Sequence, residues 1–260
     1  MCPRPRTTRT RARCMSSFKK IADFFRLEFQ RDSIDGHGMD YIASVHFDDD
    51  DSRTPGYNNA FWNGRQWAFG DGDYEVFNGF SNLLEVTANE VTHALTQYTA
   101  ELEYEYQSGA LNESISDAFA SMIKQYYAPG GKQKAKDADW LIGEGIFLVP
   151  GVVGKDRQVG SMNDYQFFPN TGYGDYGGVH INSGIPNRAF YLAATTLGDY
   201  SWEGAGKVWH ASLTDPELQD VIRKRAFQEF AHITCKHAQT MGGQPWLDGV
   251  KKAWTIVGVL

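Results

Sequence analysis

The hydrophobic period of this chain changes near residue 81, and the change limits the folds open to it. Before this point, apolar residues alternate in short runs bounded by Gly, Asn and Asp, which is typical of strands and turns. After it, apolar residues recur at helical spacing in two long runs, SNLLEVTANEVTHALTQYTA and SGALNESISDAFASMIKQYY. The pattern predicts an α+β protein with a mixed α/β first lobe and a mainly α-helical second lobe.

Shorter signals fill in both lobes. The first lobe is expected to contain a helix over SFKKIADFFRLEFQ, a strand over MDYIASVHF, and two strands joined by a hairpin at Asn63-Gly64. An Asn-Gly pair between apolar runs is a strong signal for a type I′ turn. The second lobe is expected to add three helices, over GIPNRAFYLAATTLG, LQDVIRKRAFQEFAHITCKHAQ and WLDGVKKAWTIVGVL.

Charge and composition argue against several kinds of partner. The 260-residue chain has a formal net charge of -7, whereas a nucleic-acid-binding face needs a basic stripe. No apolar run approaches the ~18 residues of a membrane helix. We therefore expect no nucleic acid and no membrane partner, and a monomer. Residues 1–15 carry five Arg and are expected to form a disordered basic arm, with an organelle address or a misassigned start as alternatives.

The run ANEVTHAL differs by one side chain from H-E-x-x-H, in which two His four residues apart bind zinc and the Glu activates water. Asn89 stands in place of the first His, and Glu90 and His93 follow in register. In the second helix, Glu113 and Asp117 have the same four-residue spacing and so share one face. Because a catalytic zinc takes three protein ligands, these residues predict a zinc site with a weakened third position.

Other polar groups on the chain have simpler interpretations. A Glu and a His on an amphipathic helix are, taken alone, most often a solvated edge. His232, Cys235 and His237 do not all share one helix face, which favours packing and surface roles over a metal cluster. The acidic run Asp48 to Asp51 lacks the alternating ligands of a calcium loop and is expected to be a solvated turn.

Together these residues belong to an ordered set of runs that resembles the thermolysin-like family of zinc metalloendopeptidases. The resemblance spans nearly the whole chain after the basic arm, through IDGHGM, YNNAFWNG, FGDGD, NEVTHALTQYTA, SGALNESISDAF, DWLIGE, GSM, GGVHINSGIPNRAFYLA and the closing AW-x-x-VGVL. It implies a two-lobed fold with the active-site cleft between the lobes. The first lobe would cover residues 16–98 and end in the active-site helix, and the second would cover residues 99–260.

The resemblance also implies a role for each matching position. His93 and Glu113 would bind zinc, and Glu90 would act as general base. The remaining positions would orient the zinc ligands (Asn112, Asp117), stabilise the oxyanion (Tyr104, His180, with Asp175 orienting the His), hold the substrate backbone (Asn59, Ala60) and line an apolar pocket for the residue after the scissile bond (Phe77, Phe80, Val86, Ile142, Val159).

Three departures from the family pattern bear on the chemistry. Asn89 is a neutral oxygen ligand where zinc favours nitrogen, sulfur or anionic oxygen. Its amide is expected to donate to Asp117 and to turn its carbonyl oxygen toward the metal. Gly160 replaces an arginine that would grip the substrate carbonyl. In the family's calcium site the ligand positions Glu85, Asp139 and Glu144 remain, but Lys124 and Leu141 occupy two others, so one weak Ca²⁺ or none is expected.

These observations leave two functions of different class. The first is a zinc endopeptidase that cuts peptides or proteins before hydrophobic residues and is impaired by Asn89 and Gly160. The second is an inactive pseudoprotease that binds peptides or regulates an active relative through the same cleft. A sequence error at position 89 is a further alternative, since one nucleotide separates the His and Asn codons. The family implies secretion, whereas this N-terminus carries no signal peptide and, if it is the true start, implies a cytoplasmic protein.

Overall fold

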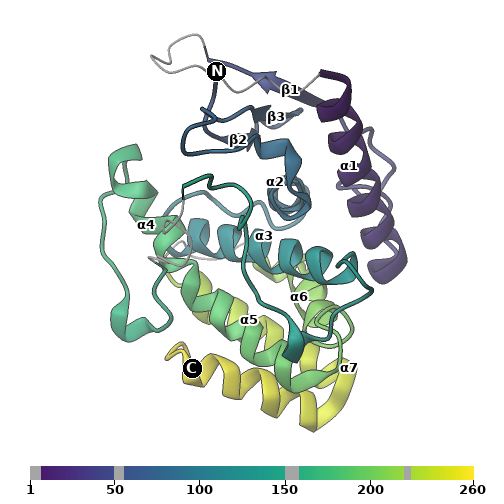
Figure 1. The fold of residues 1–260 in the computed structure, drawn as a ribbon. Helices are drawn as coiled ribbons and strands as arrows, with labels where there is room; N and C mark the ends of the chain where they lie inside the picture. The colour runs from purple at the N-terminus through teal and green to yellow at the C-terminus, as the bar shows by residue number, and fades with distance from the viewer. Residues whose placement is uncertain (1–6, 50–55, 150–157, 220–223) are drawn as a thin grey trace.

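The computed structural model describes residues 7–49, 56–149, 158–219 and 224–260. A small sheet and the helix α1 (Thr7–Phe29) form one part of the molecule, and α5, α6 and α7 form the other (Figure 1). Between them lie the paired helices α2 (Leu84–Gln97) and α3 (Tyr106–Tyr126). The predicted α+β architecture is confirmed. None of the described helices is long and apolar enough to cross a membrane.

The sheet has three strands in the order β1-β3-β2. β1 (Ala43–Phe47) runs parallel to β3 (Trp67–Gly70), and β2 (Ala60–Trp62) pairs antiparallel with β3. The predicted hairpin is confirmed, but the predicted type I′ turn is wrong. Type I′ needs positive φ at both central residues, and in the loop between the two strands only Gly64 has one, at 90°. Asn63 instead accepts hydrogen bonds from the backbone N–H groups of Arg65 and Gln66.

Helix α1 begins before the predicted helix, and this corrects the expectation of a disordered arm over residues 1–15. From Thr7 onward the arm is helical, while residues 1–6 lie outside the described chain. The physical reason is the spacing of Thr10 and Cys14, which continue the buried face of Phe18 and Ile21 and pack inward. The Arg residues alternate with them on the exposed face, so a high density of positive charge does not prevent burial of the other side.

The helices α2 and α3 are confirmed close to their predicted bounds, as is α5 (Gly184–Leu197). The two helices predicted nearest the C-terminus are confirmed as the two halves of α7 (Ala226–Ile256), which meet at a kink where Gly243 has non-helical φ and ψ. Two short helices were not predicted, α4 (Asp175–Asn182) and α6 (Ala205–Leu213). Glycines open or interrupt both of these segments and obscure their helical period.

The two parts share one hydrophobic core. Phe29 of α1 stacks on His210 of α6 with ring centroids 4.5 Å apart and planes 9° apart, and Phe119 of α3 lies against both rings. Deeper in the helical part, Trp209 and Trp254 stack at 5.9 Å. Because α3 packs against elements of both parts, it holds α2 at the boundary between them.

Candidate active site

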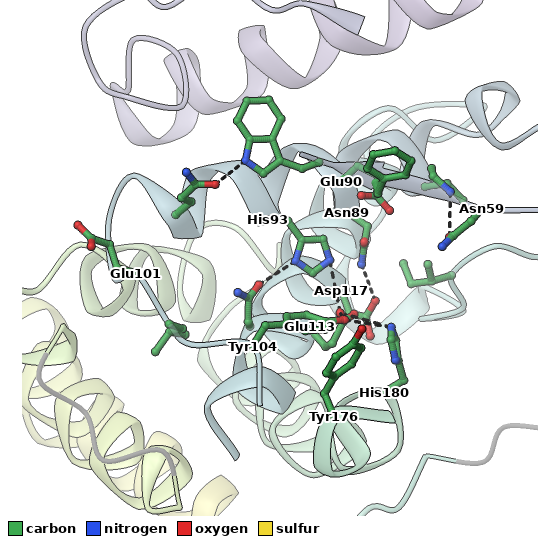
Figure 2. Close-up of a pocket in the computed structure, with 18 of the residues that line it drawn as sticks. Asn59, Asn89, Glu90, His93, Glu101, Tyr104, Glu113, Asp117, Tyr176 and His180 are labelled. Atoms are coloured by element: carbon green, nitrogen blue, oxygen red, sulfur yellow. Dashed lines mark hydrogen bonds and ion pairs between the residues drawn. The ribbon is translucent and has the colours of Figure 1, made fainter. Parts of the chain in front are cut away.

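One face of α2 forms a wall of a cavity of about 1130 Å³. The side chains on this face recur at intervals of three and four residues, as one side of a helix requires, and they are Val86, Asn89, Glu90, His93 and Gln97. The cavity is closed by α3, by β2 and the residue before it, and by His180 of α4. Figure 2 shows the polar groups of these elements pointing toward one another around His93.

His93 contacts side chains of α3 through both of its ring nitrogens. Its Nδ1 lies 2.8 Å from Oδ1 of Asn112 on α3. Because an amide oxygen only accepts, Nδ1 carries a proton, and Nε2 is the nitrogen that faces Glu113. This Nε2 lies 3.6 Å from Oε1 of Glu113. The two predicted zinc ligands therefore face each other, and Asn112 holds the imidazole as predicted.

Asn89 makes the hydrogen bond that the sequence predicted. Its Nδ2 donates to Oδ1 of Asp117 at 3.0 Å, and the other carboxylate oxygen of Asp117 accepts from Asn187 of α5 at 2.9 Å. Burial, together with the nearby charge of Glu113, raises the pKa of Asp117 to about 6. The carbonyl oxygen of Asn89 is thus the free end of its side chain, and its orientation toward a metal stays a prediction.

Two further side chains converge on Glu113. The Tyr104 hydroxyl donates a hydrogen bond to Oε1 of Glu113, and Nε2 of His180 lies 3.4 Å from the same oxygen. Nε2 of His180 is also 3.3 Å from the Tyr104 hydroxyl. Asp175 fixes His180 twice, since its carboxylate contacts Nδ1 at 2.5 Å and accepts from the backbone N–H at 2.9 Å. Positive φ angles at Asp175 and Tyr176 turn the chain so that His180 faces the cavity.

The electrostatics of the cleft favour proton transfer. Removal of Glu90 from water, with the charge of Glu113 adding to it, raises the pKa of Glu90 to about 7. The indole N–H of Trp67 donates to the Glu90 backbone carbonyl at 2.9 Å and so fixes this turn of α2. Burial opposes protonation of His180, but the carboxylates of Glu113 and Asp175 outweigh it and raise the His180 pKa.

The donor set fits a zinc ion in two of three positions. An imidazole Nε2 from His93 and a carboxylate from Glu113 are ligands that zinc accepts readily. Within the described chain, no group of three or more His, Cys, Asp or Glu side chains is arranged to hold a metal ion. The third position therefore depends on the neutral amide oxygen of Asn89, a weaker donor.

The predicted substrate-binding residues are only partly gathered at the cavity. Asn59, Ala60, Val86 and Ile142 line it, while Phe77, Phe80 and Val159 pack against the hydrophobic core beside it. Several other residues line the cavity without having been predicted to do so from the sequence, namely Phe61, Gln97, Tyr98, Glu101, Leu102, Gln158 and Tyr176. For Gln97 a signal was available, because it extends the four-residue spacing of Asn89 and His93 by one turn.

An arginine does lie beside Gly160, although from another element. Arg188 of α5 donates from Nη1 to the Gly160 carbonyl oxygen at 3.1 Å. A Cβ at residue 160 would lie only 3.2 Å from Cδ of Arg188, so the glycine leaves room for this side chain. Arg188 does not line the cavity. Arg157, the other arginine near this point in the sequence, lies outside the described residues.

The predicted calcium positions hold a lysine ammonium instead of open oxygen ligands. Nζ of Lys124 lies 3.0 Å from Asp139, 2.9 Å from Glu144 and 2.9 Å from the Leu141 carbonyl oxygen. Partial burial opposes the charge, but these carboxylates raise the pKa of Lys124. Glu85 is buried and joins none of these contacts. Lys124 therefore supplies a positive charge to the two carboxylates at these positions.

Comparison with known proteins identifies the family to which this fold belongs. The thermolysin metallopeptidase catalytic domain matches residues 10–97, and its α-helical domain matches residues 100–259. An extracellular metalloprotease of Pectobacterium carotovorum is 45% identical over 91% of this chain and 69% of its own length. Bacillolysin of Bacillus amyloliquefaciens is 37% identical over 92% of this chain and 42% of its own length.

A solved structure also resembles the whole chain. The precursor of protealysin, a metalloproteinase from Serratia proteamaculans, superposes with a TM-score of 0.86 at 40% identity, covering all of this chain and 81% of the other. The two family models together match both lobes, and therefore also the residues that line the cavity between them. The chain belongs to the thermolysin family of zinc metalloendopeptidases, whose substrates are peptides or proteins.

Proposed function

We propose that this chain is an endopeptidase that cuts before hydrophobic residues and whose activity is limited by weak metal binding at Asn89. The observation that carries the proposal is the convergence of Glu90, His93, Glu113 and the Tyr104–His180 pair on one cavity. Val86 and Ile142 on its wall support the preference for an apolar side chain, because they are the predicted pocket residues that reach the cavity. Secretion is part of the proposal and rests on the extracellular relative.

The protein groups have separable tasks. A zinc ion held by His93, Glu113 and Asn89 would supply a polarised water and an electrophile for the peptide carbonyl. Glu90, with a pKa of about 7, can take a proton from water and return it to the leaving amine near neutral pH. Burial and the Glu113 charge raise the pKa of Tyr104, so its hydroxyl stays protonated and can donate to an oxyanion. Asp175 keeps Nε2 of His180 directed toward the same place.

Cleavage of casein by the purified chain tests the proposal. With saturating zinc we expect slow cleavage, and we expect Glu90→Gln to abolish it, because Gln cannot accept the proton. Asn89→His should raise zinc affinity by more than the ~10–100-fold that the loss of an orienting group costs, because it restores a direct ligand. Zinc content after dialysis measures the affinity. If the zinc-saturated protein leaves casein intact and Glu90→Gln makes no difference, the unmodified protein is not a peptidase.

The second candidate is a pseudoprotease that binds peptides, and one observation favours it. Asp117 accepts hydrogen bonds from both Asn89 and Asn187, so its carboxylate does not need an imidazole at position 89 as a donor. On this reading only Asn89→His would retain zinc, while both forms would bind peptides in the cavity. Zinc-dependent turnover by the unmodified chain would exclude it.

A further inference from the structure

The cavity continues past the proposed reaction site to an end with its own chemistry. Five residues line this end and are called the Glu101 subsite here: Trp62, Gln97, Tyr98, Glu101 and Leu102. At 1.5 Å per residue along α2, Gln97 lies about 6 Å beyond His93, and Val86 lies about 10 Å away in the other direction. In Figure 2, Glu101 and Asn59 lie on opposite sides of His93. A peptide extended through the cavity would therefore pass both ends.

The wall of the Glu101 subsite is a fixed aromatic surface. The indole Nε1 of Trp62 donates to Oε1 of Gln97 at 2.7 Å, and the Trp62 ring packs on buried Trp67 with centroids 4.5 Å apart. Tyr98, at the end of α2, is 39% exposed, whereas Leu102 is buried beneath. Such a surface can pack the methylene stem of a long side chain and stabilise a cation over an aromatic face.

Glu101 supplies a carboxylate that the described structure does not use. Among the described residues its side chain has no hydrogen bond or ion pair, although its backbone N–H donates to the Thr96 carbonyl at 2.9 Å. Its φ is 51°, in the left-handed region that favours Gly. A non-glycine residue is strained there, and such strain is commonly kept for function.

The charged residues that line the cavity also favour a cationic substrate side chain. No described residue that lines the cavity is Lys or Arg. Four acidic residues line it, namely Glu90, Glu101, Glu113 and Asp117. Arg188, the arginine beside Gly160, donates to a backbone carbonyl away from the lining. A cationic substrate side chain at the Glu101 subsite would therefore meet a carboxylate and aromatic rings, with no lysine or arginine among the described residues of the lining.

We propose that the Glu101 subsite binds a lysine or arginine side chain of the peptide. The inference rests on the proposed function, in that it requires the cleft to hold an extended peptide. An extended chain advances about 3.3 Å per residue, so the 6 Å from His93 to Gln97 correspond to about two residues. With the apolar pocket receiving the residue after the scissile bond, the basic residue is the second or third before it.

Peptide binding to the full chain tests this subsite. Fluorescein-labelled peptides would share one hydrophobic residue and carry Arg, Lys or Gln at the second or third preceding position, and their affinity would be measured by anisotropy in EDTA to prevent turnover. We expect the basic peptides to bind roughly threefold to tenfold more tightly than the Gln peptide. The preference should shrink at 1 M salt, because the Debye length falls to about 3 Å.

Variants of the subsite separate charge from structure. Glu101→Gln and Glu101→Gly should each reduce the preference to below about twofold, and Glu101→Asp should keep part of it. Glu101→Gly should also raise the melting temperature, because glycine relieves the positive φ. Glu103→Gln removes a charge from an exposed side chain that does not line the cavity, and it should leave the preference unchanged.

The outcomes distinguish this proposal from the one on which it rests. A basic preference lost in Glu101→Gln and Glu101→Gly but kept in Glu103→Gln supports the subsite. Peptides that bind equally well with Arg, Lys or Gln, or a preference that survives Glu101→Gln, overturn the subsite and leave the peptide-binding cleft intact. If no peptide binds and none is cleaved with zinc, both proposals are wrong.

Discussion

At the scale of single residues, His210 links pH to stability. Its imidazole is largely buried against Phe29, and burial, with the charge of Arg31, lowers its pKa from 6.5 to about 4. The unfolded chain therefore takes up this proton first as the pH falls, so the stabilisation is complete above about pH 6.5 and is lost toward pH 4. We expect the free energy of unfolding to fall by about 2 kcal/mol between pH 7.5 and 5 from this group.

Urea unfolding at these two pH values measures the change. His210→Phe keeps the stacked ring and should remove that part of the pH dependence. His232→Phe, at an exposed position of α7, is the matched control and should leave it unchanged. An identical pH slope in the wild type and in His210→Phe would contradict the assignment.

Lys124 gives a second prediction at this scale, on calcium. Because its ammonium already neutralises Asp139 and Glu144, millimolar calcium should not raise the melting temperature of the unmodified chain. Lys124→Ala leaves two carboxylates and the Leu141 carbonyl oxygen without a cation, and should cost about 1 kcal/mol since both carboxylates are partly exposed.

Calcium should recover most of that loss in Lys124→Ala, and thermal melts with and without the ion measure it. Lys134→Ala breaks an exposed ion pair with Asp199 and is the control, for which no response to calcium is expected. A calcium-stabilised wild type would show that Lys124 does not replace the ion.

At the scale of elements, the kink in α7 concentrates strain at one residue. Gly243 has φ 64° and ψ -157°, a region that only glycine adopts readily. Gly243→Ala should lower the free energy of unfolding by about 1–3 kcal/mol. Met241→Ala, at an exposed position two residues earlier, should change it little. Equal denaturation midpoints for the two variants in urea would argue against a fixed kink.

The same kink shows how much of the helix pattern could be predicted from the sequence. Apolar spacing predicted α2, α3 and α5, because a buried helix face repeats regularly. It also predicted the break inside α7, because Gly243 and Pro245 interrupt the helical pattern where the backbone leaves helical φ and ψ. It missed how far α1 extends, since positive charge on one face of a helix does not reveal burial of Cys14 on the other.

The candidate site, too, could be predicted from the sequence only in part. The four-residue spacing predicted that Asn89 and His93 share one face of α2, whereas the contacts of Asp117 and Asn112 with them were implied by the family resemblance. The positions of Arg188 and Glu101 were not predictable, because each depends on how separate segments meet: α5 lies beside the loop at Gly160, and a left-handed turn brings Glu101 back toward β2.

At the scale of the whole molecule, the shared core predicts a single unfolding transition. Phe24 of α1 contacts Tyr126 of α3 and Trp202 of the helical part, and Phe29 contacts Phe119 and His210. With aromatic contacts from both parts in one cluster, neither part can open without exposing the other's core. Far-ultraviolet and near-ultraviolet circular dichroism should therefore give coincident urea transitions. Two separated midpoints would mean that the parts unfold independently.

Asp117 has a consequence for how this chain could evolve. It accepts a hydrogen bond from Asn89 of α2 and another from Asn187 of α5, so its buried carboxylate is satisfied without an imidazole at position 89. Selection for a stable fold is then separated from selection for metal chemistry. The scaffold of this chain forms with Asn at position 89, and a single-nucleotide change converts the Asn codon into a His codon. A lineage carrying Asn89 can thus lose and regain zinc binding without first repairing its fold.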